Sequence, residues 1–112
     1  MAVHDSTESR DAPLSEAMSE HAREAASFLK ALANANRLQV LCALSEAELS
    51  VSALMQRVPL SQSAMSQHLA VLRADGLVAT RRESQTVYYR IAPGPAMALI
   101  EVLHDHFCGT PG

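Results

Sequence analysis

Cys42 and Cys108 are the two cysteines of this chain and the side chains with the most varied chemistry. They stand far apart in the sequence, and neither belongs to a CxxC pair of the kind found in structural zinc sites. Two cysteines are also too few for a disulfide-stabilised scaffold. The residues alone leave two interpretations open: a reactive thiol pair, or a small buried apolar side chain at 42 and an incidental thiol near the C-terminus.

A run of short polar side chains after Pro59 could contact DNA. Within it, Met65, Leu69 and Leu72 repeat at helical spacing, which predicts a helix that buries these three side chains. Glutamine can form two hydrogen bonds to adenine, serine can donate or accept, and a capped helix N-terminus offers amide groups to a phosphate. The polar positions on the other faces are the predicted contacts to bases or to the DNA backbone: Ser61, Gln62, Ser63, Ser66 and Gln67.

Basic side chains that follow these polar positions could supply sequence-independent affinity for DNA. The net charge of the chain is −3, but residues 61–92 carry four arginines against two acidic residues, whereas residues 1–24 are acidic. His68 lies between inward positions, so we expect a packed histidine that could touch a phosphate rather than a metal ligand or a catalytic base. The predicted contacts to phosphates or to the minor groove are Arg73, Arg81, Arg82 and Gln85.

Helical periodicity before this segment predicts three further helices. Apolar residues between Met18 and Leu32 step by four and three positions, which predicts one helix from about Leu14 that is suited to packing against another helix. A second helix, capped by Asn34, should bury Leu38, Leu41 and Leu44, with Cys42 on or beside that face. A third helix, Val51–Arg57, should begin at the cap Ser50 and point Leu54 and Val58 inward.

The period changes from helical to alternating after Gly76, which should end the helix capped by Ser61. Leu77–Arg82 and Thr86–Ile91 predict a hairpin with residues 83–85 at its tip. After Pro93 a last helix is predicted from about Ala96 to Phe107, with Ile100, Leu103 and Phe107 on its apolar face. The expected fold class is mainly α with a small β-hairpin, a winged helix-turn-helix in the order helix, helix, helix, helix, strand, strand, helix.

Length and composition limit the architecture to one domain. At 112 residues and 48% hydrophobic residues, the chain can bury one core but has no room for a second domain. We expect a mobile tail over 1–13, the winged helix-turn-helix domain over 14–108 and a C-terminal tail over 109–112. Neither a membrane span nor a signal peptide is visible, which predicts a cytoplasmic protein with no membrane partner.

The sequence contains few of the features that an enzyme active site needs. A thiol-dependent enzyme using Cys108 and His104 would need an oxyanion hole, a cofactor loop or a third orienting group, and the sequence shows none of them. We therefore expect no catalytic activity and no cofactor. A protein-binding module that has lost DNA binding is the remaining alternative, and the net negative charge is its only support.

The run SQSAMSQHLAVLRADGLVATRRESQTVYYRI resembles the recognition helix and wing of the ArsR/SmtB family of bacterial winged-helix repressors, and ALANANRLQVLCAL resembles the second helix of that family. The resemblance covers roughly residues 20–108. It implies a homodimer, joined through its first and last helices, that binds double-stranded operator DNA and leaves it when an inducer binds. Ser84 stands where many members have a glycine at the wing tip.

This chain departs from the metal-sensing members of the family at the positions where those members bind their inducer. Those members carry a cysteine pair in a run similar to ELCVC, where this chain has Glu48-Leu49-Ser50-Val51-Ser52, and serine hydroxyls are poor ligands for soft metals. Others bind zinc through Asp and His at the start of the last helix, where Gly94-Pro95-Ala96-Met97 supplies no ligand.

The placement of Cys42 and Cys108 resembles the persulfide-sensing SqrR/BigR-like branch, in which the two cysteines are joined within one subunit. The resemblance implies that a persulfide or polysulfide inducer bridges Cys42 and Cys108 by a disulfide or a longer polysulfide, which releases the DNA. His104 lies four residues before Cys108 and, when protonated, would favour its thiolate. Two alternatives stay open: metal sensing by Cys42, Cys108 and the C-terminal histidines His104 and His106, or a general thiol-redox or peroxide response.

Overall fold

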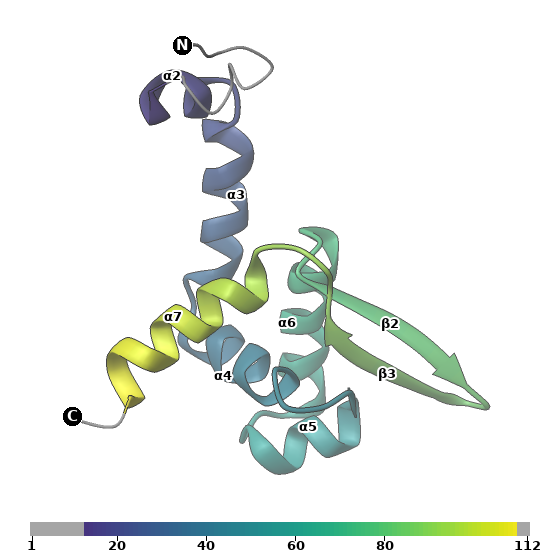
Figure 1. Ribbon diagram of the computed structural model, residues 1–112. Coiled ribbons are helices and arrows are strands. Elements are labelled where there is room, and N and C mark those ends of the chain that lie inside the picture. Colours follow the sequence, from purple (N-terminus) through teal and green to yellow (C-terminus); the bar gives the residue numbers. More distant parts are fainter. Residues whose placement is uncertain (1–12, 110–112) are drawn as a thin grey trace.

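The computed structural model describes residues 13–109 and confirms a mainly helical winged helix-turn-helix fold (Figure 1). The predicted N-terminal and C-terminal tails, apart from Pro13 and Gly109, lie outside the described residues. No helix within the described range is long and apolar enough to cross a membrane. The elements are α2 (Leu14–Ser19), α3 (Ala22–Leu32), α4 (Ala35–Leu44), β1 (Leu49–Ser50), α5 (Val51–Arg57), α6 (Gln62–Ala74), β2 (Val78–Glu83), β3 (Thr86–Ile91) and α7 (Ala96–Cys108).

The prediction of one continuous helix from Leu14 to Leu32 is wrong, because this segment forms two helices, α2 and α3, separated at Glu20 and His21. The hydroxyl of Ser19 donates a hydrogen bond of 2.9 Å to the carbonyl of Glu16, a side-chain bond that competes with regular helix and bends it. No residue of α2 is buried, so no packing within the chain opposes the break.

The three predicted helix caps are confirmed. Each cap residue accepts a hydrogen bond from the backbone amide three residues later, which satisfies an amide that has no partner inside the helix. These bonds fix where the helices that carry the thiol and the polar face begin: Asn34 accepts from Arg37 at 3.1 Å, Ser50 from Ala53 at 3.2 Å and Ser61 from Ala64 at 3.2 Å.

Gly76 ends α6 and turns the chain directly into the hairpin. Its φ of +76° lies in the left-handed region, and its amide donates to the carbonyl of Arg73 at 3.1 Å. The next amide, of Leu77, donates to the carbonyl of Leu72 at 2.8 Å, and the Leu77 side chain is fully buried. This pair of bonds is the Schellman arrangement, which anchors the base of the wing to the end of α6.

The hairpin is confirmed, but its tip is shorter than predicted. Glu83 pairs with Thr86, so the turn consists of Ser84 and Gln85 alone. Ser84 adopts the positive φ, +59°, for which glycine is usually required. A third strand, β1, was not predicted: its two residues pair antiparallel with Tyr88 and Tyr89, giving the strand order β1-β3-β2.

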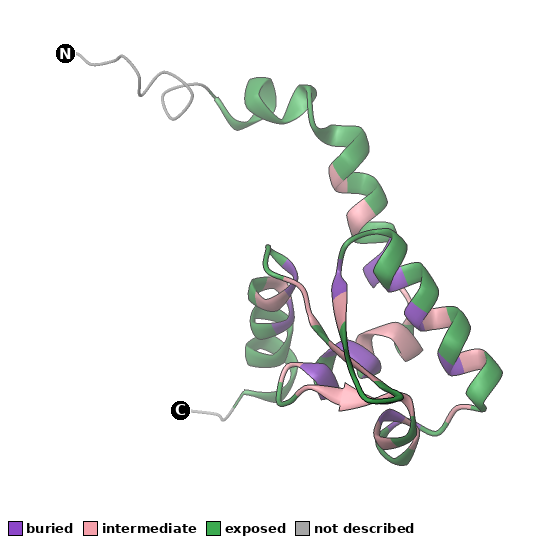
Figure 2. Cartoon of the chain, turned by 90° about the vertical axis from the view of Figure 1, so that its right-hand side faces the viewer, coloured by how far each residue is buried: buried purple, intermediate pink, exposed green. Residues whose placement is uncertain are grey.

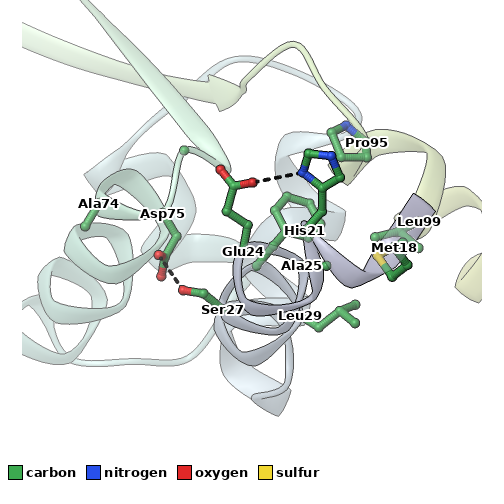
Figure 3. A pocket seen from close by; sticks show the side chains of 12 residues that line it. Met18, His21, Glu24, Ala25, Ser27, Leu29, Ala74, Asp75, Pro95 and Leu99 are labelled. Carbon is green, nitrogen blue, oxygen red and sulfur yellow. Dashed lines mark hydrogen bonds and ion pairs between the residues drawn. The ribbon is translucent and has the colours of Figure 1, made fainter. Parts of the chain in front are cut away.

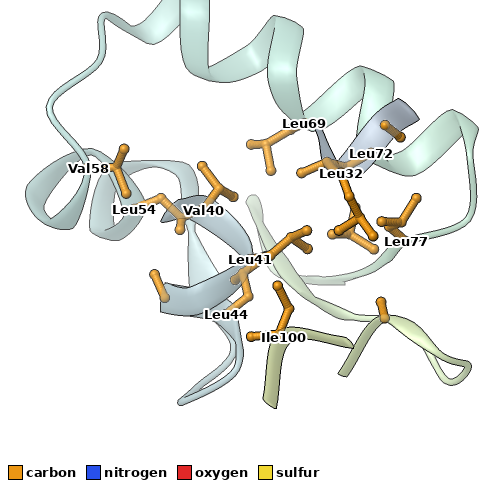
Figure 4. Packing of buried hydrophobic residues seen from close by; sticks show 14 of the residues in the cluster. Leu32, Val40, Leu41, Leu44, Leu54, Val58, Leu69, Leu72, Leu77 and Ile100 are labelled. Carbon is orange, nitrogen blue, oxygen red and sulfur yellow. The ribbon is translucent and has the colours of Figure 1, made fainter. Parts of the chain in front are cut away.

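One hydrophobic core joins the helices to the base of the wing (Figures 2 and 4). The apolar face predicted for α6 is confirmed, and the predicted inward residues of α4 and α5 are buried except Leu38, which is half-buried. The largest fully buried side chains come from α4, α5, α6 and the start of the wing: Val40, Leu41, Leu54, Met65, Leu69, Leu72 and Leu77.

Two apolar faces remain outside this core. The predicted apolar face of α7 is only partly buried, because Ile100 is 4% exposed whereas Leu103 is 38% and Phe107 is 75% exposed. On α2 and α3, Leu14, Met18 and Leu29 are also exposed. A single copy of the chain therefore leaves hydrophobic surface on the helices at both ends of the domain.

The packing of the core predicts that substitutions at two positions on α6 differ strongly in their effect on the free energy of unfolding. Leu69→Ala removes a side chain that is 1% exposed and leaves a cavity, so the free energy of unfolding should fall by about 2–5 kcal/mol. Val71→Ala, at a position that is 38% exposed on the same helix, should change the stability by less than about 1 kcal/mol. Urea unfolding followed by circular dichroism at one protein concentration measures both, and equal losses would contradict the packing described for α6.

Candidate functional site

The exposed face of α6 carries the predicted polar contacts. Ser61, Gln62, Ser63, Ser66 and Gln67 are all exposed, on the side of the helix away from the buried leucines. Ser61 additionally caps the helix, and its hydroxyl lies 3.4 Å from that of Ser63. Together with α5 and the turn at Pro59, this arrangement is that of a helix-turn-helix with its second helix free to enter a groove.

His68 is separated from the other predicted contacts. It is half-buried, and its Nδ1 lies 3.4 Å from a terminal nitrogen of Arg37. Arg37 also donates from Nε to the carbonyl of Ala31 at 2.6 Å. His68 thus forms part of the contact between α6 and the junction of α3 and α4, which agrees with the expectation of a packed histidine.

Arg81 lies on the wing as predicted, but acidic side chains surround its guanidinium. Nε donates to Glu48 at 2.6 Å and a terminal nitrogen donates to Glu83 at 2.9 Å, while the group stacks 4.7 Å from the centre of the Tyr88 ring. The hydrogen bonds to Glu83 and Glu48 raise the pKa of Arg81 above its ordinary value. Its positive charge is therefore largely balanced within the protein.

Glu48 is a residue of this surface that the sequence analysis did not select. Its second carboxylate oxygen lies 3.9 Å from Arg90, so one acid faces two wing arginines. The missed signal was β1: pairing of Leu49 and Ser50 with β3 brings Glu48 beside the hairpin, and a two-residue strand has no periodicity to recognise.

The other predicted cations and the wing-tip amide are accessible. Arg73 at the end of α6, Arg82 on β2 and Gln85 at the tip are exposed. Within residues 13–109, neither Arg73 nor Arg82 takes part in an ion pair, so these two charges are available to phosphates.

The two thiols lie on neighbouring helices, and both are exposed and reduced. Cys42 is on α4 between Leu41 and Ala43, which are both buried. The thiol therefore lies beside the buried face of α4 and not on it, which is one of the two positions expected from the sequence. It borders a groove of about 350 Å³ between α4 and α7. The side chains that line this thiol groove are Cys42, Ser45, Glu46, Met97, Ile100, Glu101, His104 and Asp105.

Cys108 extends the same stripe of α7. It follows Asp105 by three residues and His104 by four, the spacings that place side chains on one helical face. Partial burial, the charge of Cys108 and that of Glu46 raise the pKa of the Cys42 thiol, in that order of size. Cys42 and Cys108 thus lie on two helices, α4 and α7, that pack against each other, although they stand far apart in the sequence.

Metal ligands are not concentrated in this region. Residues 13–109 contain no group of three or more His, Cys, Asp or Glu side chains placed to hold a metal ion. His104 instead lies 3.8 Å from the carboxylate of Asp105. Ser50, which occupies one of the thiol positions of metal-sensing relatives, uses its hydroxyl to cap α5.

A larger hollow, of about 880 Å³, lies between the α2–α3 arm and the junction of α6 with α7 (Figure 3). Met18, Leu29 and Leu99 give it apolar walls. At its edge the hydroxyl of Ser27 bonds to Asp75 at 3.3 Å, which links α3 to the end of α6. Two of its apolar residues, Met18 and Leu29, also belong to the exposed hydrophobic surface described above.

Comparison with known proteins gives consistent matches. A family model described as bacterial regulatory protein, arsR family, matches residues 34–80. The transcriptional activator HlyU of Vibrio cholerae is 53% identical over 91 residues, which cover 81% of this chain and 84% of HlyU. The biofilm growth-associated repressor of Agrobacterium fabrum is 44% identical, over 82% of this chain and 79% of the repressor.

Solved structures agree with this placement. The repressor BigR of Xylella fastidiosa superposes with a TM-score of 0.79 at 38% identity, over 88% of this chain and all of BigR. A homodimeric winged helix-turn-helix DNA-binding domain from Mycobacterium bovis, described as a possible ArsR-family regulator, superposes with a TM-score of 0.72 at 28% identity, over all of this chain and 98% of that domain. The chain belongs to the ArsR/SmtB family of winged-helix transcriptional regulators.

Proposed function

We propose that this chain is a homodimeric repressor that binds double-stranded operator DNA and releases it when reactive sulfur species bridge Cys42 and Cys108. The observation that carries the proposal is the placement of the two thiols on helices that pack against each other: Cys42 on α4 lines the thiol groove, and Cys108 follows the groove residues His104 and Asp105 on α7 by one turn. The relatives include proteins named as a repressor and one named as an activator. Release from DNA on oxidation is compatible with either outcome for transcription.

Binding to DNA would place α6 in the major groove and the wing beside it. The exposed serines and glutamines of α6 face outward, where base edges would lie, and Arg73 and Arg82 are free to neutralise phosphates. Arg81 is a poorer phosphate ligand than the sequence suggested, because Glu48 and Glu83 already accept hydrogen bonds from two of its five N–H donors.

Dimerisation would cover the hydrophobic surface that one copy leaves exposed. Leu29 on α3 and Val102, Leu103 and Phe107 on α7 are the largest apolar side chains outside the core on these two helices. A second copy that packs there would present two α6 helices at a fixed separation, as a helix-turn-helix dimer needs for two half-sites. The homodimeric neighbour from Mycobacterium bovis supports this assembly.

The sensing step needs two nucleophilic substitutions at sulfur, and the first of them transfers a sulfur atom to the protein. The exposed Cys108 thiolate attacks the outer sulfur of a persulfide R–S–SH, forming Cys108–S–SH and releasing the thiolate R–S⁻. The Cys42 thiolate then attacks the Cys108 sulfur, forms the disulfide and expels HS⁻. The two thiols lose two electrons in total, and these electrons reduce the transferred sulfur to sulfide.

A longer bridge follows when both thiols have accepted sulfur. Two protein persulfides condense to Cys42–S–S–S–Cys108 and release one H₂S, so atoms and electrons balance without a further oxidant. A plain disulfide requires Cα atoms within about 7 Å, and an inserted sulfur relaxes that requirement.

A bridge would act on DNA binding through α4. It would tie α7 to α4, whose buried side chains share the core with those of α6. Glu46, one turn after Cys42, also pairs with Arg57 at the end of α5 at 2.7 Å. A shift of α4 would therefore reach both helices of the helix-turn-helix, and a change in the separation of the two α6 helices would lower affinity.

The wing makes a first prediction. Arg82→Gln should weaken binding to all DNA sequences and lower the slope of log affinity against log salt by about 0.9 for each phosphate that the protein no longer neutralises. Arg81→Gln should lower that slope less than Arg82→Gln does, because two of the Arg81 donors are already engaged by Glu48 and Glu83. Fluorescence anisotropy with labelled duplex DNA over a salt series measures both slopes, and an equal decrease in the two variants would refute this assignment.

The second prediction concerns the two thiols. Reduced protein treated with glutathione persulfide should lose roughly 5- to 150-fold in affinity for an operator selected from random DNA, the usual range of allosteric coupling. Cys42→Ser and Cys108→Ser should bind the operator when reduced and keep their affinity after treatment. Ser52→Ala, an exposed hydroxyl deletion away from the thiol groove, serves as the control and should respond like the native protein.

Intact mass distinguishes the alternatives to this mechanism. It counts the sulfur atoms in the bridge, and in Cys42→Ser it should show a persulfide that persists on Cys108. Loss of DNA binding by Cys108→Ser equal to that of the native protein would refute the bridge. Loss with hydrogen peroxide but not with the persulfide would assign a general redox response, and loss with stoichiometric metal would assign metal sensing.

The pKa of Cys42 makes the third prediction. Because this pKa is raised, bridge closure by the Cys42 thiolate should accelerate as pH increases, up to and beyond the ordinary pKa of a cysteine. Glu46→Gln removes one of the negative charges that raise it, so the rate profile should move to lower pH. Stopped reactions analysed by mass give the rates, with Glu24→Gln on α3 as the control; a profile unmoved by Glu46→Gln would contradict the electrostatic cause.

A further inference from the structure

The thiol groove is bordered by acidic side chains from both of its helices. Glu46 on α4 faces Glu101 and Asp105 on α7 across the groove. Glu46 is paired with Arg57, and these two residues also line, together with Cys42, a second groove between α4 and the end of α5; among the described residues, the ion-pair partner of Asp105 is His104 at 3.8 Å. Within residues 13–109, Glu101 takes part in no ion pair. The surroundings of the thiols therefore carry net negative charge.

The backbone adds to this field. Cys42 lies in the last turn of α4, and Cys108 is the last residue of α7. The C-terminus of a helix carries the negative end of the helix dipole, so both thiols are at negative ends. Among residues 13–109, no lysine or arginine lines this groove.

We propose that this groove selects sulfur donors by charge, so that a neutral or cationic persulfide reaches Cys42 and Cys108 faster than an anionic one. The inference rests on the proposed function, because it concerns which inducer reaches the same thiols. Glu101 and Asp105 are the specificity-determining residues, since they border the path to the thiols without being reactants. Two such charges repel an anionic donor that approaches within about 7 Å, and this repulsion raises the free energy of approach enough to slow the reaction several-fold.

The raised pKa of Cys42 agrees with a negative electrostatic potential around this thiol. Partial burial is the largest cause of this raised pKa, and the negative charges of Cys108 and Glu46 follow it in disfavouring the Cys42 thiolate. An incoming carboxylate would meet the same field. The effect is electrostatic and partly exposed to solvent, so it should weaken with salt.

The test compares two donors whose charge apart from the persulfide group is opposite: cysteamine persulfide, with one ammonium group, and glutathione persulfide, whose two carboxylates outweigh its single ammonium group. Their rates of bridging are measured by intact mass on the reduced full-length protein. The ratio of the two rates is then divided by the same ratio for the double variant Glu101→Gln, Asp105→Asn. This quotient cancels the intrinsic reactivity of each donor, and we expect it to be roughly tenfold at low salt and to approach one at high salt.

The control removes the same charge elsewhere. Glu16→Gln with Glu20→Gln on α2 lowers the negative charge equally, far from the groove lining, and should give the native ratio. A quotient near one at low salt, with bridges formed by both donors, would overturn the charge selection and leave the proposed function intact. Failure of both donors to bridge the thiols would instead overturn the proposed function.

Discussion

The burial of one face of α6 is the constraint on which the rest of this molecule depends. Met65, Leu69 and Leu72 are sealed against the core, and this fixes the rotation of the helix about its axis. Serines and glutamines on the opposite face then have to point to solvent, where a DNA groove could receive them. The same packing connects α6 to α4, and α4 carries Cys42 on its outer side. The polar face of α6 and the Cys42 thiol thus share one rigid support.

Much of this arrangement was predictable from interactions between residues that are close in the sequence. Caps at Asn34, Ser50 and Ser61 and the glycine stop at Gly76 are short-range features, because each depends on hydrogen bonds between residues a few positions apart. The apolar repeat of α6 was equally visible, since a helix with one buried face must show its period in the sequence. Family membership, which the comparisons show, was apparent from the residues of the recognition helix and wing.

Features that leave the apolar repeat unchanged, or that depend on contacts distant in the sequence, were not predictable. The division between α2 and α3 came from a side-chain hydrogen bond and from the lack of packing on α2, neither of which alters the apolar repeat. Glu48 reached the wing arginines through a strand of two residues, too short to show alternation. The acidic border of the thiol groove combines residues from α4 and α7, and their positions along the chain gave no reason to consider Glu46 and Glu101 together.

Ser50 shows how one side chain can limit the evolution of a sensor. Its hydroxyl closes the first turn of α5 by accepting the amide of Ala53 at 3.2 Å, and a thiol is a weaker acceptor for that bond. A lineage that exchanged this serine for a cysteine to gain a metal ligand would weaken the start of the first helix of its DNA-binding unit before any metal bound. Such an exchange therefore passes through a less stable intermediate, unless another residue takes over the cap first.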